Sequence, residues 1–122
     1  MAQHIVSYAG IRLPLPRFQK KVETISMIQS IIKRDGRVVL YDQNKIAAAI
    51  LRSLEASGDG NAADAARVAN DVQRELESRF STQAPNIEAI QDTVERQLMN
   101  HGFSAAAKAY ILYRANRTRA RE

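Results

Sequence analysis

Apolar residues recur every three to four positions in four successive segments of this 122-residue chain. An α-helix has about 3.6 residues per turn, so this spacing gathers the apolar side chains on one helical face. The pattern predicts helices over residues 42–56 and 62–80, a third from Asn86 to Gly102, and a fourth after Ser104. Each helix can bury its apolar stripe only against the others, so the four helices should form a bundle.

The expected helix ends carry residues that suit those positions. Asp42, Asn86 and Ser104 have short polar side chains, which accept hydrogen bonds from the free N–H groups of a first helical turn. Gly102 stands where a glycine in the left-handed conformation commonly closes a helix. These residues therefore set the boundaries that we expect for three of the four helices.

A different pattern precedes the first helix. Residues 27–41 are rich in β-branched side chains and contain an Asp-Gly pair at residues 35–36, which is a strong signal for a two-residue hairpin turn. A turn of that length would place Arg34 directly opposite Arg37. The expected fold is therefore mostly helical α+β, with a bundle of about four helices capped by a small β-hairpin.

Two stretches flank this domain, which we place at residues 27–117. Residues 1–26 contain Pro14 and Pro16, and each proline fixes its own φ angle and favours an extended residue before it. We therefore expect an extended N-terminal arm there. Residues 118–122 should form a basic C-terminal tail.

Composition excludes several kinds of chemistry. The chain has no cysteine, which removes disulfides, thiolate zinc sites and thiol nucleophiles, and its two histidines make a metal site improbable. No apolar run reaches the roughly 20 residues that span a bilayer, so we expect a cytoplasmic protein with no membrane partner. Eighteen basic and 13 acidic residues give a net charge of +5, which favours an anionic partner such as a nucleotide, a nucleic acid or an acidic protein surface.

Four cations surround the expected turn: Lys33, Arg34, Arg37 and Lys45. The two-residue turn would put Lys33 on one face of the hairpin with the apolar side chains of Val38 and Leu40. Lys45 lies in the first turn of a helix, where the helix dipole disfavours a cation unless an anion is also bound there. The cluster is interpreted either as a solvated surface or as an anion-binding site.

The spacing of these residues resembles a known family. The chain has "KRDG" at residues 33–36, Tyr41-Asp42 at the end of the next strand, and Lys45-Ile46 at the start of a helix. With the later "HGFSAAAKAYILYR" of residues 101–114, this order resembles the ATP-cone family. The resemblance implies a small domain, a hairpin over a helical bundle, that binds ATP or dATP as an allosteric signal and has no catalytic residues.

The same resemblance implies which residues contact the nucleotide. Lys33, Arg34 and Lys45 should meet the triphosphate. The strand backbone around Ile31 and Ile32 should lie along the nucleotide. Mg²⁺ should accompany the triphosphate, because no carboxylate cluster in the sequence offers a separate metal site.

Three further positions carry weaker expectations. Asp42 should hold the sugar or base region, or else serve only as a helix cap. Glu88 falls where the family often has another contact, although capping explains it equally well. The basic segment from Arg114 to Arg117 is a candidate phosphate contact, and a solvated helix end is the alternative.

Two functions remain open at this level. The first is a regulatory, non-catalytic ATP- or dATP-binding domain that controls a ribonucleotide reductase, with the reductase catalytic chain as its partner and with nucleotide-dependent self-association. The second is a nucleic-acid-binding or transcriptional-regulator module, related to ATP-cone repressors, that uses the basic residues near the C-terminus on phosphates.

Overall fold

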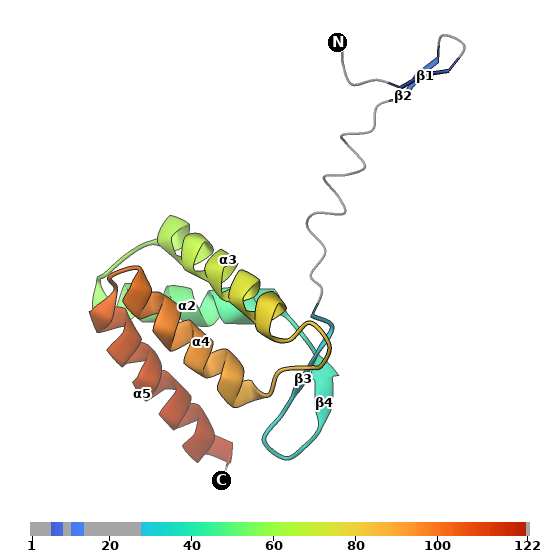
Figure 1. The fold of residues 1–122 in the computed structure, drawn as a ribbon. Coiled ribbons are helices and arrows are strands. Elements are labelled where there is room, and N and C mark those ends of the chain that lie inside the picture. Colours follow the sequence, from blue (N-terminus) through green and yellow to red (C-terminus); the bar gives the residue numbers. More distant parts are fainter. Residues whose placement is uncertain (1–5, 9–10, 14–27, 122) are drawn as a thin grey trace.

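The computed structural model describes residues 6–8, 11–13 and 28–121. Within them, four helices pack into a bundle, and a two-stranded antiparallel hairpin covers one end of it (Figure 1). The mostly helical α+β fold expected from the sequence is therefore confirmed. The elements are β3 (Ser30–Ile32), β4 (Val38–Leu40), α2 (Gln43–Ser57), α3 (Ala62–Arg79), α4 (Ile87–Asn100) and α5 (Ser104–Arg121).

A second short hairpin lies near the N-terminus. Strands β1 (Val6–Tyr8) and β2 (Ile11–Leu13) pair antiparallel, with Val6 opposite Leu13. Most of the expected arm, including Pro14 and Pro16, lies outside the described residues. The extended arm over residues 1–26 therefore stays a prediction.

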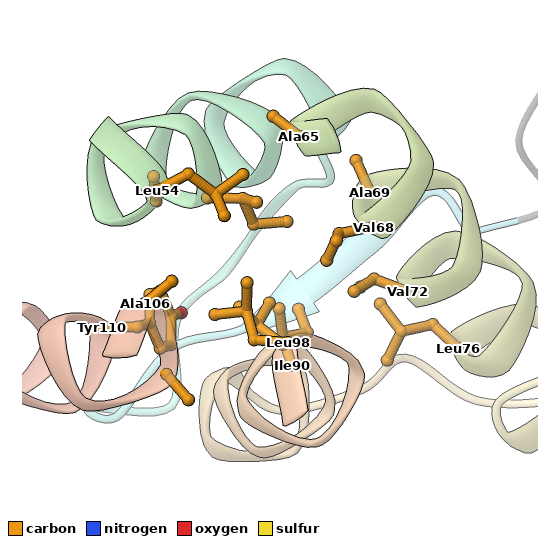
Figure 2. Packing of buried hydrophobic residues seen from close by; sticks show 14 of the residues in the cluster. Leu54, Ala65, Val68, Ala69, Val72, Leu76, Ile90, Leu98, Ala106 and Tyr110 are labelled. Atoms are coloured by element: carbon orange, nitrogen blue, oxygen red, sulfur yellow. The ribbon is translucent and has the colours of Figure 1, made fainter. Parts of the chain in front are cut away.

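The four helices share one apolar core. Leu54 of α2, Leu76 of α3 and Leu98 of α4 are fully buried, and Tyr110 of α5 is buried beside them. Figure 2 shows these side chains converging from all four helices on the same interior. Burying one such side chain stabilises the fold by about 1.5 to 3 kcal/mol, so the apolar stripes account for the assembly of the bundle.

Local signals place most helix ends as expected. The Asp42 carboxylate accepts a hydrogen bond from the Asn44 N–H at 3.0 Å and caps α2. The Asn86 side chain accepts one from the Ala89 N–H at 2.8 Å and caps α4. Gly102 follows α4 with a φ of 85°, a left-handed conformation that glycine adopts without strain.

The expected cap of α5 is wrong. Ser104 is the first residue of the helix and not its cap. A distant acceptor takes the role, because the Asp59 carboxylate accepts a hydrogen bond from the Ala106 N–H at 2.9 Å. The loop between α2 and α3 is thereby tied to the start of α5.

The expected register of the β3–β4 hairpin is also wrong. Ile31 lies opposite Val39, so each pair is shifted by one residue from the two-residue turn. The loop contains three residues, 34–36, and Gly36 has a φ of 89°. An Asp-Gly pair suits this loop as well, because a turn followed by a left-handed residue also requires a glycine.

The observed register changes the neighbours of Lys33. Ile31 and Val39 pack toward the helices, and the alternation of a strand places Lys33 on their face. Val38 and Leu40 belong to the other face and are 67% and 83% exposed. The two-residue turn would have placed Lys33 on the same face as these two side chains. In the structure, Lys33 lies on the opposite face.

Backbone and side-chain contacts hold the hairpin on the bundle. The Ile32 N–H donates to the carbonyl oxygen of Pro85 at 3.0 Å, just before α4 begins. The Tyr41 hydroxyl donates to the amide oxygen of Gln73 on α3. The hairpin is thus fixed against α3 and against the loop that leads into α4.

Candidate functional site

A cavity of about 170 Å³ lies between the hairpin, α2, α4 and α5. Its wall is made of apolar and aromatic side chains together with four cations, one carboxylate and a few neutral polar groups. The lining residues are Ile31, Lys33, Arg34, Val39, Leu40, Asp42, Lys45, Ile46, Ala49, Ile87, Ile90, Gln91, Tyr110, Tyr113, Arg117 and Thr118.

Part of the wall is apolar and buried. Ala49 of α2, Ile90 of α4 and Tyr110 of α5 each expose very little surface. The rings of Tyr110 and Tyr113 lie 5.9 Å apart, centroid to centroid, and are tilted by 33°. Burial raises the pKa of the Tyr110 hydroxyl far above its ordinary value, so this wall stays uncharged. An uncharged wall of aromatic and aliphatic side chains can pack against a flat apolar part of a ligand.

Four cations line the same cavity, and they come from three parts of the chain. Lys33 and Arg34 follow β3, Lys45 lies in the first turn of α2, and Arg117 lies near the end of α5. Asp42 is the acidic residue of the lining, and its carboxylate caps α2. A cavity lined mainly by one sign of charge concentrates ions of the opposite sign.

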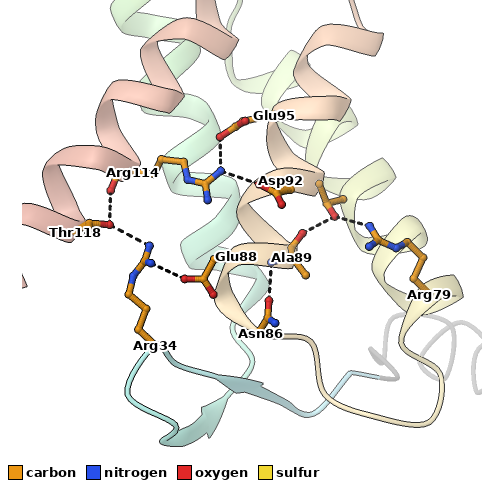
Figure 3. Close-up of polar contacts among 10 residues, drawn as sticks. Arg34, Arg79, Asn86, Glu88, Ala89, Asp92, Glu95, Arg114 and Thr118 are labelled. Carbon is orange, nitrogen blue, oxygen red and sulfur yellow. Dashed lines mark hydrogen bonds and ion pairs between the residues drawn. The ribbon is translucent and has the colours of Figure 1, made fainter.

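Arg34 bridges two helices from the loop of the hairpin. Its Nη1 lies 2.6 Å from the Glu88 carboxylate of α4, and its Nη2 donates to the Thr118 hydroxyl of α5 at 3.0 Å (Figure 3). Both charged side chains are more than 40% exposed, so the pair contributes only about 0 to 1 kcal/mol to stability. These contacts position the guanidinium at the cavity without holding it strongly.

The other arginine of the hairpin has a local partner. Arg37 Nε lies 2.7 Å from the Asp35 carboxylate, and the Arg37 N–H also donates to Asp35. The backbone N–H and then the guanidinium hold the pKa of the Asp35 carboxyl below its ordinary value. Arg37 does not line the cavity, and the observed register removes its expected opposition to Arg34.

The structure brings five of the eight expected nucleotide contacts together around the cavity. These are Ile31, Lys33, Arg34, Asp42 and Lys45. Glu88 lies beside them through its ion pair with Arg34. Ile32 does not line the cavity, and its N–H donates to the carbonyl oxygen of Pro85.

Arg114 points elsewhere. Its Nη1 lies 3.0 Å from the Asp92 carboxylate and 2.5 Å from the Glu95 carboxylate, both on α4 (Figure 3). Two carboxylates largely neutralise its charge toward other anions. Arg117, almost one turn further along α5, lines the cavity instead, and the role of Arg114 as a phosphate contact stays a prediction.

The sequence predicted no role for Gln91, whereas Arg117 was already a candidate phosphate contact and Tyr110 and Tyr113 were expected in the core. Tyr110, Tyr113 and Arg117 recur at helical spacing and therefore share one face of α5, but the spacing alone favours a core role for the tyrosines. Gln91 follows Ile87 by four residues and shares its face of α4. Helical periodicity identifies these faces, whereas only packing shows that they meet at a cavity.

The fold and the cavity together define a small, mostly helical domain whose cavity combines four cations with an aromatic, apolar wall. Residues 29–119 match the sequence model of a protein family described as the ATP cone domain. The match covers well over half of the sequence. The chain belongs to the ATP-cone family.

Curated relatives are ribonucleotide reductases. The chain is 39% identical to the vitamin B12-dependent ribonucleoside-diphosphate reductase of Thermoplasma acidophilum, over 79% of this chain and 13% of the relative. It is 36% identical to the ribonucleoside-diphosphate reductase subunit alpha of Chlamydia pneumoniae, over 86% and 11%. It is 38% identical to the anaerobic ribonucleoside-triphosphate reductase of Salmonella typhimurium, over 79% and 13%. The chain thus spans little more than a tenth of these relatives.

The part of the chain that the structure describes contains neither a metal-ligand cluster nor a membrane-spanning helix. No three histidine, aspartate or glutamate side chains gather there as a candidate metal site. In the same residues, no helix has both the length and the apolar character needed to cross a lipid bilayer.

Proposed function

We propose that the cavity binds ATP or dATP. The observation that carries this proposal is the joining of four cations and an aromatic, apolar wall in one cavity of an ATP-cone domain. A nucleoside triphosphate has the matching parts, since its phosphates are anionic and its base is flat and largely apolar. The residues present therefore fit this ligand.

The cations would hold the triphosphate. Lys33, Arg34 and Lys45 would donate charge-assisted hydrogen bonds, which contribute about 1.5 to 3 kcal/mol each when partly shielded from water. Lys45 lies where the N-terminus of α2 adds its own positive potential, so an anion offsets the unfavourable position of this lysine. Arg117 would add a fourth cation.

Other expected contacts stay part of the proposal. The backbone of β3 at Ile31 and Ile32 would follow the nucleotide. Asp42 is a candidate for holding the sugar or base region, and Glu88 is a candidate for a further contact. Arg114 would reach a phosphate only after leaving its carboxylate partners. Mg²⁺ would enter on phosphate oxygens, because it prefers oxygen ligands and keeps several waters.

The proposed role is regulatory and non-catalytic. The relatives are reductases that the chain covers only in small part, and the chain has no cysteine, whereas reduction of ribonucleotides uses thiols. We infer that nucleotide binding here controls a reductase catalytic chain, which is the proposed partner. The cytoplasmic location expected from the sequence stays a prediction.

Titration calorimetry with the magnesium complexes of ATP, dATP and GTP tests the proposal. We expect saturable binding of ATP and dATP, weaker binding of GTP, and only a modest loss between about 50 and 200 mM salt. Binding to a nucleic-acid backbone would instead fall about 10³-fold or more over that range and would ignore the base. No heat with ATP or dATP at millimolar concentration would refute the proposal.

We also propose that ATP or dATP changes the self-association of the chain. The helical surface offers exposed apolar side chains for this, among them Met99 of α4 and Ile111 and Leu112 of α5. Sedimentation velocity should show different species without nucleotide, with ATP and with dATP. Identical sedimentation under all three conditions would count against this part of the proposal.

A further inference from the structure

The cavity contains one buried polar atom without a partner. Among the residues that the structure describes, none donates a hydrogen bond to the side-chain oxygen Oε1 of Gln91, although this atom is shielded from solvent. Gln91 lines the cavity from α4. Buried polar atoms are nearly always hydrogen-bonded, so an unpaired acceptor in a binding cavity indicates that a ligand supplies the donor.

Gln91 lies about one helical turn from the residue of α4 that pairs with Arg34. Glu88, which contacts Arg34, precedes Gln91 by three residues, so the two Cα positions differ by roughly 4.5 Å along the axis of α4. The chain neighbour Ile90 also lines the cavity and is buried. Gln91 therefore lines the cavity beside a buried apolar side chain and within one turn of the ion pair between Glu88 and Arg34.

The chemistry of Oε1 excludes a phosphate as its partner. A carbonyl oxygen only accepts hydrogen bonds, and phosphate oxygens at neutral pH are acceptors too. Within a bound nucleotide, the donor would come from the base or from a ribose hydroxyl. Adenine carries an exocyclic amino group at C6, whereas guanine carries a carbonyl oxygen at that position.

We propose that Gln91 determines base specificity by accepting a hydrogen bond from the 6-amino group of adenine. This inference rests on the proposed function, because it assigns one residue of the same site to the base. Guanine would place an acceptor against an acceptor. A buried polar group left unpaired by the wrong ligand is an effective basis for discrimination.

The test compares ATP with purine riboside triphosphate, which lacks the 6-amino group and is otherwise the same. Wild type should bind ATP about fivefold more tightly than this analogue, the scale of one neutral hydrogen bond. Gln91→Leu should bring that ratio close to one. Gln91→Glu keeps an oxygen at the same place and should retain the preference, even though its added charge weakens binding of both triphosphates.

A control variant and a second measurement separate this role from a structural one. Gln83 is exposed in the loop before α4 and does not line the cavity, so Gln83→Leu should leave the ratio unchanged. Without nucleotide, Gln91→Leu should be as stable to urea as wild type or more stable, because it removes a buried unpaired acceptor. A purely structural glutamine would give a less stable variant with an unchanged ratio.

The outcomes distinguish this inference from the function on which it rests. If wild type binds neither triphosphate, the proposed function and this inference both fail. If ATP binds and Gln91→Leu keeps the wild-type ratio, the function stands and the assignment of Gln91 is overturned. If Gln91→Leu instead abolishes a difference between ATP and dATP while the base preference stays, Gln91 contacts the ribose and the assignment to adenine is wrong.

Discussion

Replacing Lys45 with alanine is expected to raise the dissociation constant for ATP about tenfold. Lys45 lines the cavity from the first turn of α2, so its ammonium should donate directly to phosphate in a partly shielded site. Such a bond contributes about 1.5 to 3 kcal/mol, and 1.4 kcal/mol corresponds to one factor of ten. Calorimetric titration with the magnesium complex of ATP measures the change.

Arg37→Ala is the matched control, because it removes the same charge from the same hairpin region. Arg37 is bonded to Asp35 and does not line the cavity, so its loss should weaken binding by a free energy of about 1 kcal/mol or less, and salt should screen this effect. Without nucleotide, Lys45→Ala should be as stable as wild type or slightly more so, since a cation at a helix N-terminus is unfavourable. Equal impairment of the two variants would show that the site is not built on the start of α2.

Replacing Leu54 with alanine is expected to lower the free energy of unfolding by about 2 to 5 kcal/mol. Leu54 of α2 is fully buried in the core that all four helices share, so its loss removes apolar contacts and leaves a cavity. The free energy of unfolding of an ordinary domain is about 5 to 15 kcal/mol, so such a change removes a large share of it. Urea unfolding followed by circular dichroism measures it.

Leu112→Ala provides the same substitution on the surface. Leu112 of α5 is 67% exposed, so this variant should stay within about 0.5 kcal/mol of wild type. A small effect at Leu54, comparable with that at Leu112, would mean that the apolar stripes do not hold the bundle together as described.

The helices could be predicted from the sequence because their signals are local. The expected first helix, residues 42–56, differs by one residue at each end from α2, Gln43–Ser57. Its cap, its apolar stripe and its length all depend on residues close together in the chain. The start of α5 shows the limit, since its capping acceptor, Asp59, comes from a loop 47 residues away from Ala106.

The hairpin was predictable in kind but not in register. An Asp-Gly pair is compatible with both a two-residue and a three-residue loop, because each needs a glycine with positive φ. Packing favours the observed choice, in which Ile31 and Val39 both face the helices. The two-residue turn would have placed Arg34 directly opposite Arg37. In the observed loop, Arg34 pairs with the Glu88 carboxylate and Arg37 pairs with the Asp35 carboxylate.

The candidate site was predictable on the side of the hairpin and α2. Lys33, Arg34 and Lys45 lie close together in the sequence, so the motif could identify them, and the cavity brings them together. Arg117 and Gln91 lie on α5 and α4, and only the packing of those helices brings them to the cavity. The burial of one atom of Gln91 is a property of the packed structure and has no signature in the sequence.

A nuclear magnetic resonance titration of the isotope-labelled chain with the magnesium complex of ATP tests the central claim most directly. It reports both binding and its location, residue by residue. The account predicts that the largest shifts occur at backbone amides around the cavity, among them Lys33, Lys45 and Gln91. Arg67 and Arg74, exposed on α3 and outside the cavity lining, should barely shift. Largest shifts on α3, shifts confined to the end of α5, or no shifts at saturating ATP would contradict the account.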